Sequence, residues 1–318
     1  MLKLNSRVLL PFIFFLVSLA ELRAQDPQFS QFYANPVYLN PAFAGTARCP
    51  RMTMNYRNQW PNLPARYVTY SVAGDMHIDA LAGGLGVIVM TDDQAHSLLR
   101  TTNASLIYSY HAPINRFFSL KFGMQATYFQ KVLDYNSLHF GDMIDPRRGF
   151  IWNTSETMPN QIKRGADFSA GVLGYSKKYF FGVAAHHITQ PDEGLLGSSP
   201  MPAKFTAHGG AVIELEKGGE SYISPNILFM AQKAHKQLNL GLYYVKGPFV
   251  AGLWYRNTDA VIALIGLQNQ NFKFGYSYDI TVSKLAGNTG GSHEISLQMQ
   301  IECKAKSKKY RTIRCPSF

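Results

Sequence analysis

The sequence has few cysteines, and it lacks a long apolar segment beyond its first residues. Its 318 residues include only three cysteines, Cys49, Cys303 and Cys315, which excludes a disulfide-rich scaffold. The longest uncharged stretches after residue 25, such as 261–272, are broken by Gly, Gln and Asn. A helical inner-membrane protein is excluded, because each spanning helix needs about 20 mostly apolar residues.

Residues 1–24 have the three parts of a secretory signal peptide. Lys3 and Arg7 form a basic start, residues 8–20 are apolar, and Ala24 supplies a small residue for cleavage. An uncleaved anchor is the alternative, but the apolar run is short for a membrane-spanning helix. We therefore expect export and a mature chain that begins after Ala24.

Export implies an oxidising compartment, in which disulfides persist. Cys303 and Cys315 could close a short loop there and leave Cys49 free. Three unpaired thiols are the alternative, and both stay open at this point.

Apolar and polar residues alternate with a period of two along most of the chain, which predicts an all-β protein. In the clearest segment, 118–128, Phe, Leu, Met, Ala and Tyr alternate with Ser, Lys, Gly, Gln and Thr. About fourteen strands are predicted, each about long enough to cross a bilayer when tilted. They are 51–59, 66–74, 84–91, 99–110, 117–130, 166–175, 179–188, 204–215, 221–232, 237–246, 249–256, 259–268, 272–281 and 292–303. Region 237–268 can be divided differently, so about twelve or sixteen strands are the alternatives.

The lengths of the connections favour a transmembrane antiparallel β-barrel over a soluble β-sandwich. Short turns follow every second strand, at 113–115, 176–178, 217–219, 246–248 and 268–271. The intervening connections include the long segments 60–65, 133–165, 189–203 and 282–291. Outer-membrane barrels have short periplasmic turns and longer extracellular loops. We predict that residues 51–303 form such a barrel in the outer membrane of a Gram-negative bacterium, with both barrel ends of the chain on the periplasmic side.

Residues 25–50 do not alternate, and their four prolines prevent regular strand pairing. Their many aromatic residues suit a periplasmic or plug segment packed inside or beneath the barrel mouth, and a flexible leader is the alternative. Charged residues expected to line the lumen are Arg51, Lys121, Glu214, Lys273, Asp279, Glu294 and Glu302. Their mixed signs favour a plugged interior over a selective pore.

No motif for catalysis, metal binding or cofactor binding is present. Neighbouring His186 and His187 on one strand should point to opposite faces, so they are poor joint metal ligands, and His208 lies on the next strand. Candidates for a hydrolytic site, which no motif joins, are Ser105, Ser169, His208 and Asp167. We expect no enzyme activity, no cofactor and no metal.

Two segments outside the predicted strands are candidates for binding a partner. The tail 304–318 is basic, and a periplasmic partner or passing substrate with an acidic patch could dock on Lys304, Lys306, Lys308, Lys309, Arg311, Arg314 and Phe318. A solvated charge run is the alternative. The loop 133–165 is the extracellular candidate, through Asp142, Asp145, Arg147, Arg148 and Trp152, and a merely shielding loop is the alternative. Nucleic-acid binding poorly explains the net charge of +11 in an exported protein.

Several segments resemble the PorP/SprF family, outer-membrane proteins of the type IX secretion system. They are QFSQFYANPVYLNPAFAGT (28–46), YRNQWPNLPARYVTYSVAGD (56–75), GGLGV (83–87), LHFGDMIDP (138–146), DFSAGVLGY (167–175), HHITQP (186–191) and the closing CPSF. The resemblance runs from Gln25 to Phe318. It implies a non-catalytic accessory role in export or surface attachment of a secreted protein, commonly a large adhesin, including those used in gliding motility. The partners it implies are outer-membrane lipids, the translocon, the periplasmic lipoprotein ring and the adhesin-like cargo.

The alternative function is a FadL-like uptake channel for a hydrophobic small molecule. Fatty-acid-transporter barrels carry tripeptides similar to the NPA of 40–42. An uptake channel should conduct or bind its ligand as the isolated protein, whereas an accessory subunit should co-purify with secretion components or an adhesin.

Overall fold

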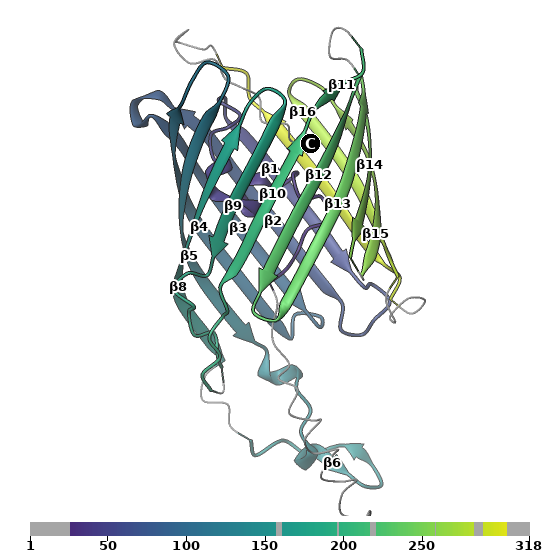
Figure 1. Cartoon of the computed structure of the whole chain (residues 1–318). Coiled ribbons are helices and arrows are strands. Elements are labelled where there is room, and N and C mark those ends of the chain that lie inside the picture. Colours follow the sequence, from purple (N-terminus) through teal and green to yellow (C-terminus); the bar gives the residue numbers. More distant parts are fainter. Residues whose placement is uncertain are drawn as a thin grey trace, which may run out of the picture.

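A computed structural model describes residues 26–156, 161–195, 197–216, 221–257, 259–282 and 289–303. Its main body is a closed antiparallel barrel of 14 strands, as predicted (Figure 1). The strands follow one another around the wall, and β17 pairs with β1 to close it. The barrel strands are β1 (Arg51–Gln59), β2 (Tyr67–Ile78), β3 (Gly83–Gln94), β4 (Leu99–Pro113), β5 (Ser119–Leu133), β8 (Ile162–Tyr175), β9 (Tyr179–His186), β10 (Lys204–Ala211), β12 (Ser221–Gln232), β13 (His235–Lys246), β14 (Phe249–Arg256), β15 (Ala260–Gln268), β16 (Phe272–Thr281) and β17 (Ser292–Gln300).

The remaining strands are short. β11 (Ile213–Glu214) continues the register of β10 against β12, beyond a break at Val212. β6 (Ile144–Asp145) and β7 (Gly149–Phe150) form a hairpin outside the barrel. The helical turns are α2 (Pro36–Leu39), η1 (Pro41–Phe43), η2 (Asp79–Leu81), η3 (Tyr135–Ser137) and η4 (Gly141–Met143). Within the described ranges, none of the helices has the length and apolar character needed to cross a membrane.

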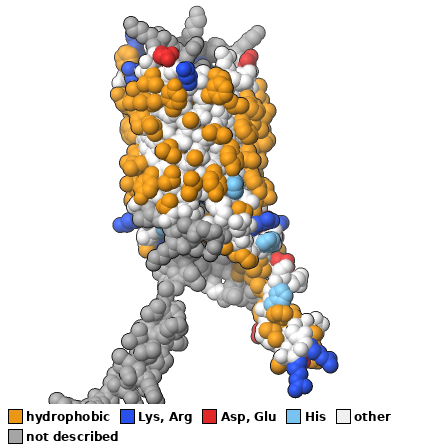
Figure 2. All heavy atoms as spheres, turned by 90° about the vertical axis from the view of Figure 1, so that its right-hand side faces the viewer, with side chains coloured by type: hydrophobic (Ala, Val, Ile, Leu, Met, Phe, Trp, Pro, Cys, Tyr) orange, Lys and Arg blue, Asp and Glu red, His pale blue; other side chains and the backbone are white. Residues whose placement is uncertain are grey.

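Alternation along each strand places apolar side chains on the outside of the wall. On β5, Met124 is 68% exposed, while Lys121 is 1% exposed and faces the lumen. Figure 2 shows hydrophobic side chains around the middle of the barrel and charged side chains near its two ends. This is the surface that a bilayer requires, because hydrocarbon solvates apolar side chains and not charges.

The two ends of the barrel differ. The terminal end contains the start of β1 and the end of β17, together with the short turns after β8, β13 and β15. The loop end contains connections 60–66, 134–161 and 187–203, and the β6–β7 hairpin projects from it away from the barrel (Figure 1). β4, β5 and β8 are the longest strands, at 15, 15 and 14 residues, so that side of the wall is extended.

Residues 26–50, here called the luminal segment, lie inside the barrel. Their side chains are largely buried, and Tyr33 and Phe43 pack with Trp254 and Phe180 of the wall in the hydrophobic core. The core of this protein is therefore the contact between the luminal segment and the inner face of the barrel.

Glycines on the inner face allow the luminal segment to touch the wall backbone. A Cβ atom at Gly123 of β5 would lie 2.2 Å from the Ala42 nitrogen, and one at Gly84 of β3 would lie 2.3 Å from the Ala44 oxygen. Any side chain at these positions would displace residues 41–44, so the wall is shaped for this segment.

Candidate functional site

The luminal segment runs the length of the lumen, from the loop end to the terminal end. Asp26 contacts Lys204, whose strand partner Gln232 precedes the β12–β13 turn at the loop end. At the other end, Gln300 of β17 donates a hydrogen bond of 3.1 Å to the Ala47 carbonyl oxygen. The contacts between these points form the clusters described below, which hold the segment against the inner wall.

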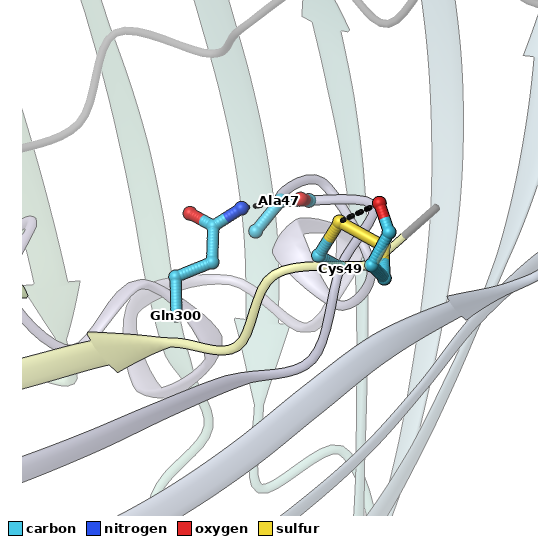
Figure 3. The surroundings of a disulfide bond; sticks show 4 residues. Ala47, Cys49 and Gln300 are labelled. Carbon is cyan, nitrogen blue, oxygen red and sulfur yellow. Dashed lines mark hydrogen bonds between the residues drawn. A yellow bond between two sulfur atoms is a disulfide. The ribbon is translucent and has the colours of Figure 1, made fainter. Parts of the chain in front are cut away.

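A disulfide joins the luminal segment to the last strand at the terminal end. Cys49 and Cys303 are bonded with their Cα atoms 5.6 Å apart, and Figure 3 shows Cys49 beside Ala47 and Gln300. Both alternatives that the sequence left open, a Cys303–Cys315 bridge and three unpaired thiols, are wrong in this structure, because Cys303 is bonded to Cys49. Sequence spacing suggested the nearer partner, but closure of the barrel brings the two ends of the chain together. Cys315 lies outside the described residues.

The first cluster, the outer anchor, holds the start of the luminal segment. The Asp26 carboxylate lies 2.5 Å from Lys204 Nζ and 2.8 Å from His187 Nε2, and His187 Nδ1 lies 2.8 Å from Asp167. Burial would lower the pKa of His187, but the carboxylates of Asp26 and Asp167 outweigh it and raise the pKa to about 9. Burial would raise the pKa of Asp26, yet Lys204 and His187 hold it far below its ordinary value. At neutral pH the anchor is therefore a set of ion pairs.

The three histidines considered as metal ligands, His186, His187 and His208, all contact the luminal segment. His186 Nε2 lies 3.3 Å from the Leu39 carbonyl oxygen, and the His208 ring stacks on Phe43 with centroids 5.3 Å apart. His187 was expected to face away from His186, but both contact the luminal segment. The reason is local: β9 ends at His186, and His187 has a φ of 56°, which turns its side chain out of the strand alternation.

The second cluster, the arginine anchor, surrounds Ser30. Arg57 of β1 lies 2.9 Å from Asp279 of β16 and 3.3 Å from Glu294 of β17. Ser30 donates from its N–H to Glu294 and from its hydroxyl to Asp279, and its hydroxyl accepts from Arg57. Arg256 of β14 adds a contact of 3.4 Å to Asp279. All these charges are buried, and a buried charge is tolerated when it is paired and hydrogen-bonded.

The third cluster, the terminal anchor, fixes residues 44–46. Arg51 pairs with Asp75 through two contacts of 2.8 and 3.0 Å, and Asp75 accepts a hydrogen bond of 2.7 Å from the Gly45 N–H. The Ala44 carbonyl oxygen accepts from the Lys121 ammonium and from the Ser109 hydroxyl. Wall charges thus satisfy backbone groups of a segment that has no sheet partner of its own.

Between these clusters, Asn40 ties the NPAFAG stretch to the wall. Its side-chain oxygen accepts from the Ala42 N–H at 2.9 Å, which caps η1. Its amide donates to the carbonyl oxygens of Val172 and Val183, at 3.1 and 3.2 Å. The stretch that suggested a hydrophobic-ligand channel has a structural role here.

Most of the predicted lumen charges are inside the barrel. Arg51, Lys121, Asp279 and Glu294 are buried there, and Lys273 is half-buried. The prediction is wrong for Glu214 and Glu302, which are exposed at the rim because β11 and β17 end beside them. The two cavities found beside the luminal segment measure about 30 and about 60 Å³, enough for a few water molecules.

The remaining sequence candidates are not assembled into a catalytic site. Ser105 bonds to Thr127 at 2.8 Å, while Asp167 pairs with His187 and accepts from Thr189. His208 is instead held between Asn40 and Phe43. Ser169 lines the larger cavity.

The loop proposed to hold a secreted partner forms the projecting hairpin. Asp142 accepts hydrogen bonds from Thr154 and Ser155, and the Ser155 N–H lowers the pKa of its carboxyl. Asp145 accepts from the N–H groups of Arg147 and Arg148. Both acids thus shape the loop. Its exposed residues include Arg147, Arg148, Phe150 and, at 58%, Trp152. The predicted signal peptide, 1–24, and the tail 304–318 lie outside the described residues.

Comparison with known proteins identifies the family. The family model for the type IX secretion system membrane protein PorP/SprF matches residues 21–299 of this chain. The chain belongs to the PorP/SprF family. Its barrel and its family place it in the outer membrane. No curated protein matches the chain.

Solved structures similar to this PorP/SprF protein are outer-membrane barrels. The Ralstonia pickettii toluene transporter TbuX is 11% identical with a TM-score of 0.50, covering 84% of this chain and 93% of its own. A Pseudomonas aeruginosa FadL homologue is 12% identical with a TM-score of 0.45, covering 84% and 94%. Acinetobacter baumannii Omp33 is 7% identical with a TM-score of 0.45, covering 80% and 100%. At 11% identity, the similarity to TbuX shows a shared fold and nothing more.

Proposed function

We propose that this protein is a non-catalytic accessory subunit of the type IX secretion system, which supports export or surface attachment of a secreted protein such as a large adhesin. Membership of the PorP/SprF family supports the pathway. Gliding motility would follow where the adhesin is a motility adhesin.

Closure of the lumen carries this proposal. The luminal segment is held by the outer, arginine and terminal anchors and by the Cys49–Cys303 bond. A polypeptide or nutrient that crossed the lumen would have to displace buried ion pairs, each of which costs several kcal/mol to break on one side. We infer that the protein acts through its two ends and not through its interior.

The two ends suit different partners. We infer that the loop end faces outward, where the β6–β7 hairpin and its neighbouring loops contact the secreted protein. The terminal end would face the periplasm, where the basic tail 304–318 docks on acidic surfaces of the translocon or the lipoprotein ring.

The alternative is a FadL-like uptake channel, and the cavities argue against it. The apolar cavity beside Phe32, Leu39 and Met230 measures about 30 Å³. A cavity that binds a small aromatic molecule measures about 150 Å³. A ligand of that size would therefore not fit this cavity unless the luminal segment moved.

Affinity purification tests the proposal. The intact protein should retain type IX components and a secreted protein, whereas a chain truncated after Cys303 should keep the disulfide and lose the periplasmic partners. A full-length variant with Gln at the six basic tail positions keeps the tail and removes its charge. Loss of the periplasmic partners in this variant would assign the docking to charge. The proposal fails if the intact protein retains neither a type IX component nor a secreted protein.

A further inference from the structure

The barrel wall has an unpaired stretch on β8. This strand pairs with β5 from Ile162 to Tyr175, but with β9 only from Ala170 to Tyr175. Residues 162–169, here called the β8 edge, therefore have a partner strand on one side alone. The stretch lies at the loop end, on the extended side of the wall formed by β4, β5 and β8 (Figure 1).

The edge is open because the chain leaves the wall early. β9 ends at His186, and the positive φ of His187, held by Asp26 and Asp167, takes the chain out of the regular ladder, so that Ile188 makes one further backbone bond to Phe168. The loop that follows then contacts inward-facing side chains of β5 and β8. Its contacts are Thr189 with Asp167, Asp192 with Lys163 and Glu193 with Lys131. Within the described part of this loop, only Ile188 bonds to the backbone of the β8 edge, and the other contacts are made through side chains.

Backbone N–H and C=O groups of alternate residues point to the open side of the β8 edge. The Ile188 N–H donates to the Phe168 carbonyl oxygen at 3.0 Å, so Phe168 directs its backbone groups to the β9 side. Because the direction alternates with a period of two, Ile162, Arg164 and Ala166 direct theirs the same way. Among the residues that the structure describes, none bonds to the backbone of these three at that edge.

The side chains of the edge are exposed and carry a recognisable pattern. Ile162 is 45% exposed and Phe168 is 50% exposed, with Arg164 and Ala166 exposed between them. The Arg164 Nε donates to Gln130, and within the described ranges its guanidinium forms no ion pair. An incoming strand would therefore find two apolar positions and one unneutralised cation.

We propose that the β8 edge binds an extended segment of the secreted protein, which adds a strand with a carboxylate opposite Arg164. Unpaired edges are templates for such addition, since main-chain hydrogen bonds supply affinity and alternate side chains supply specificity. This inference rests on the proposed function, because it names how the cargo would be held. A second copy of this chain fits less well, since two-fold pairing of two edges brings their Arg164 side chains close together.

Site-specific crosslinking in cells tests the inference. A photoreactive p-benzoylphenylalanine at position 168, where Phe168 is 50% exposed and Arg164 is kept, should crosslink to a protein exported by type IX secretion, within an extended strand of that protein. The same probe at Tyr244, exposed near the end of β13 at the terminal end of the barrel, is the control and should not reach it. A crosslink only to another copy of this chain, or no crosslink to an exported protein, would overturn the inference.

A proline substitution separates backbone pairing from mere proximity. With the probe at position 168, Ala166→Pro removes an N–H that faces the open side, so the barrel should still form and show its heat-modifiable gel migration. The crosslink yield should fall about tenfold, whereas Ala166→Thr, which keeps the N–H, should change it by less than about twofold. Equal yields in the two variants would refute strand addition. Continued co-purification of cargo with Ala166→Pro would then leave the proposed function standing, whereas absence of cargo from the wild type would refute that function itself.

Discussion

Cys49 and Cys303 are 254 residues apart in sequence, but their Cα atoms lie 5.6 Å apart at the terminal end of the barrel. The bond joins a residue shortly before β1 to one shortly after β17, beside the seam at which these two strands pair. It therefore fastens the exit of the luminal segment to the last strand.

Removing this disulfide should lower the stability of the protein. Cys49→Ser should reduce the free energy of unfolding by about 2–5 kcal/mol, because the bond restricts a very long loop in the unfolded chain. Urea unfolding in detergent micelles measures the change, and Cys315→Ser is the matched control. Equal midpoints for Cys49→Ser and the wild type would show that the bond contributes nothing.

Removing Arg57, one of the two cations of the arginine anchor, should free the start of the luminal segment. Arg57→Ala leaves Glu294 without its arginine partner, at a cost of about 3–5 kcal/mol. Amide exchange of residues 28–33 should then be faster by a factor of 100 or more, as about 1.4 kcal/mol corresponds to tenfold. The double variant Arg57→Met with Glu294→Gln removes both charges and keeps the Asp279–Arg256 pair, so most of the protection should return. Slow exchange in Arg57→Ala would contradict the role of this anchor.

A methyl group on the inner wall should displace the NPAFAG stretch. In Gly123→Ala the new Cβ would lie 2.2 Å from the Ala42 nitrogen, so residues 41–44 must shift. Gly74→Ala is the matched control, because its nearest neighbours are 3.9 Å away. Limited proteolysis should cleave the luminal segment in the first variant and spare it in the second. Resistance in both would mean that the close approach is not required.

The outer anchor should weaken at high pH. His187 has a pKa of about 9, above its ordinary 6.5, so its contribution is complete below pH 6.5 and is lost as the pH rises through 9. The pKa of Asp26 is lowered, so its contribution persists above its ordinary 3.8 and is lost only in strong acid. Amide exchange of residues 26–29, corrected for intrinsic rates, should therefore accelerate between pH 7 and 10. His187→Gln should abolish that acceleration, and an unchanged profile in this variant would exclude His187 as its cause.

The barrel could be predicted from sequence wherever lipid dictates the side chains. Residues 118–128 alternate because every second side chain faces hydrocarbon, and β5 covers them almost completely. Outside the membrane this requirement ends. The predicted strand begins only at 166, because Lys163 and Arg164 interrupt the apolar alternation. In the structure β8 begins at Ile162.

The clusters inside the lumen could not be predicted in the same way. Arg57 lies on the same face as Arg51, so alternation indicates that it points inward, but its partner Ser30 belongs to a segment without any periodicity. Contacts such as Ser30 with Asp279 join residues 249 apart and exist only after the barrel closes. The same closure selects Cys49 as the partner of Cys303.

Ion conductance in planar bilayers tests the closed lumen most directly. The intact purified protein should show no steady conductance above that of the bare membrane, because the luminal segment fills the barrel. A variant lacking residues 26–47, which retains Cys49, should form stable open channels and confirms that insertion can be detected. Steady open channels from the intact protein would contradict the account and favour an uptake channel instead.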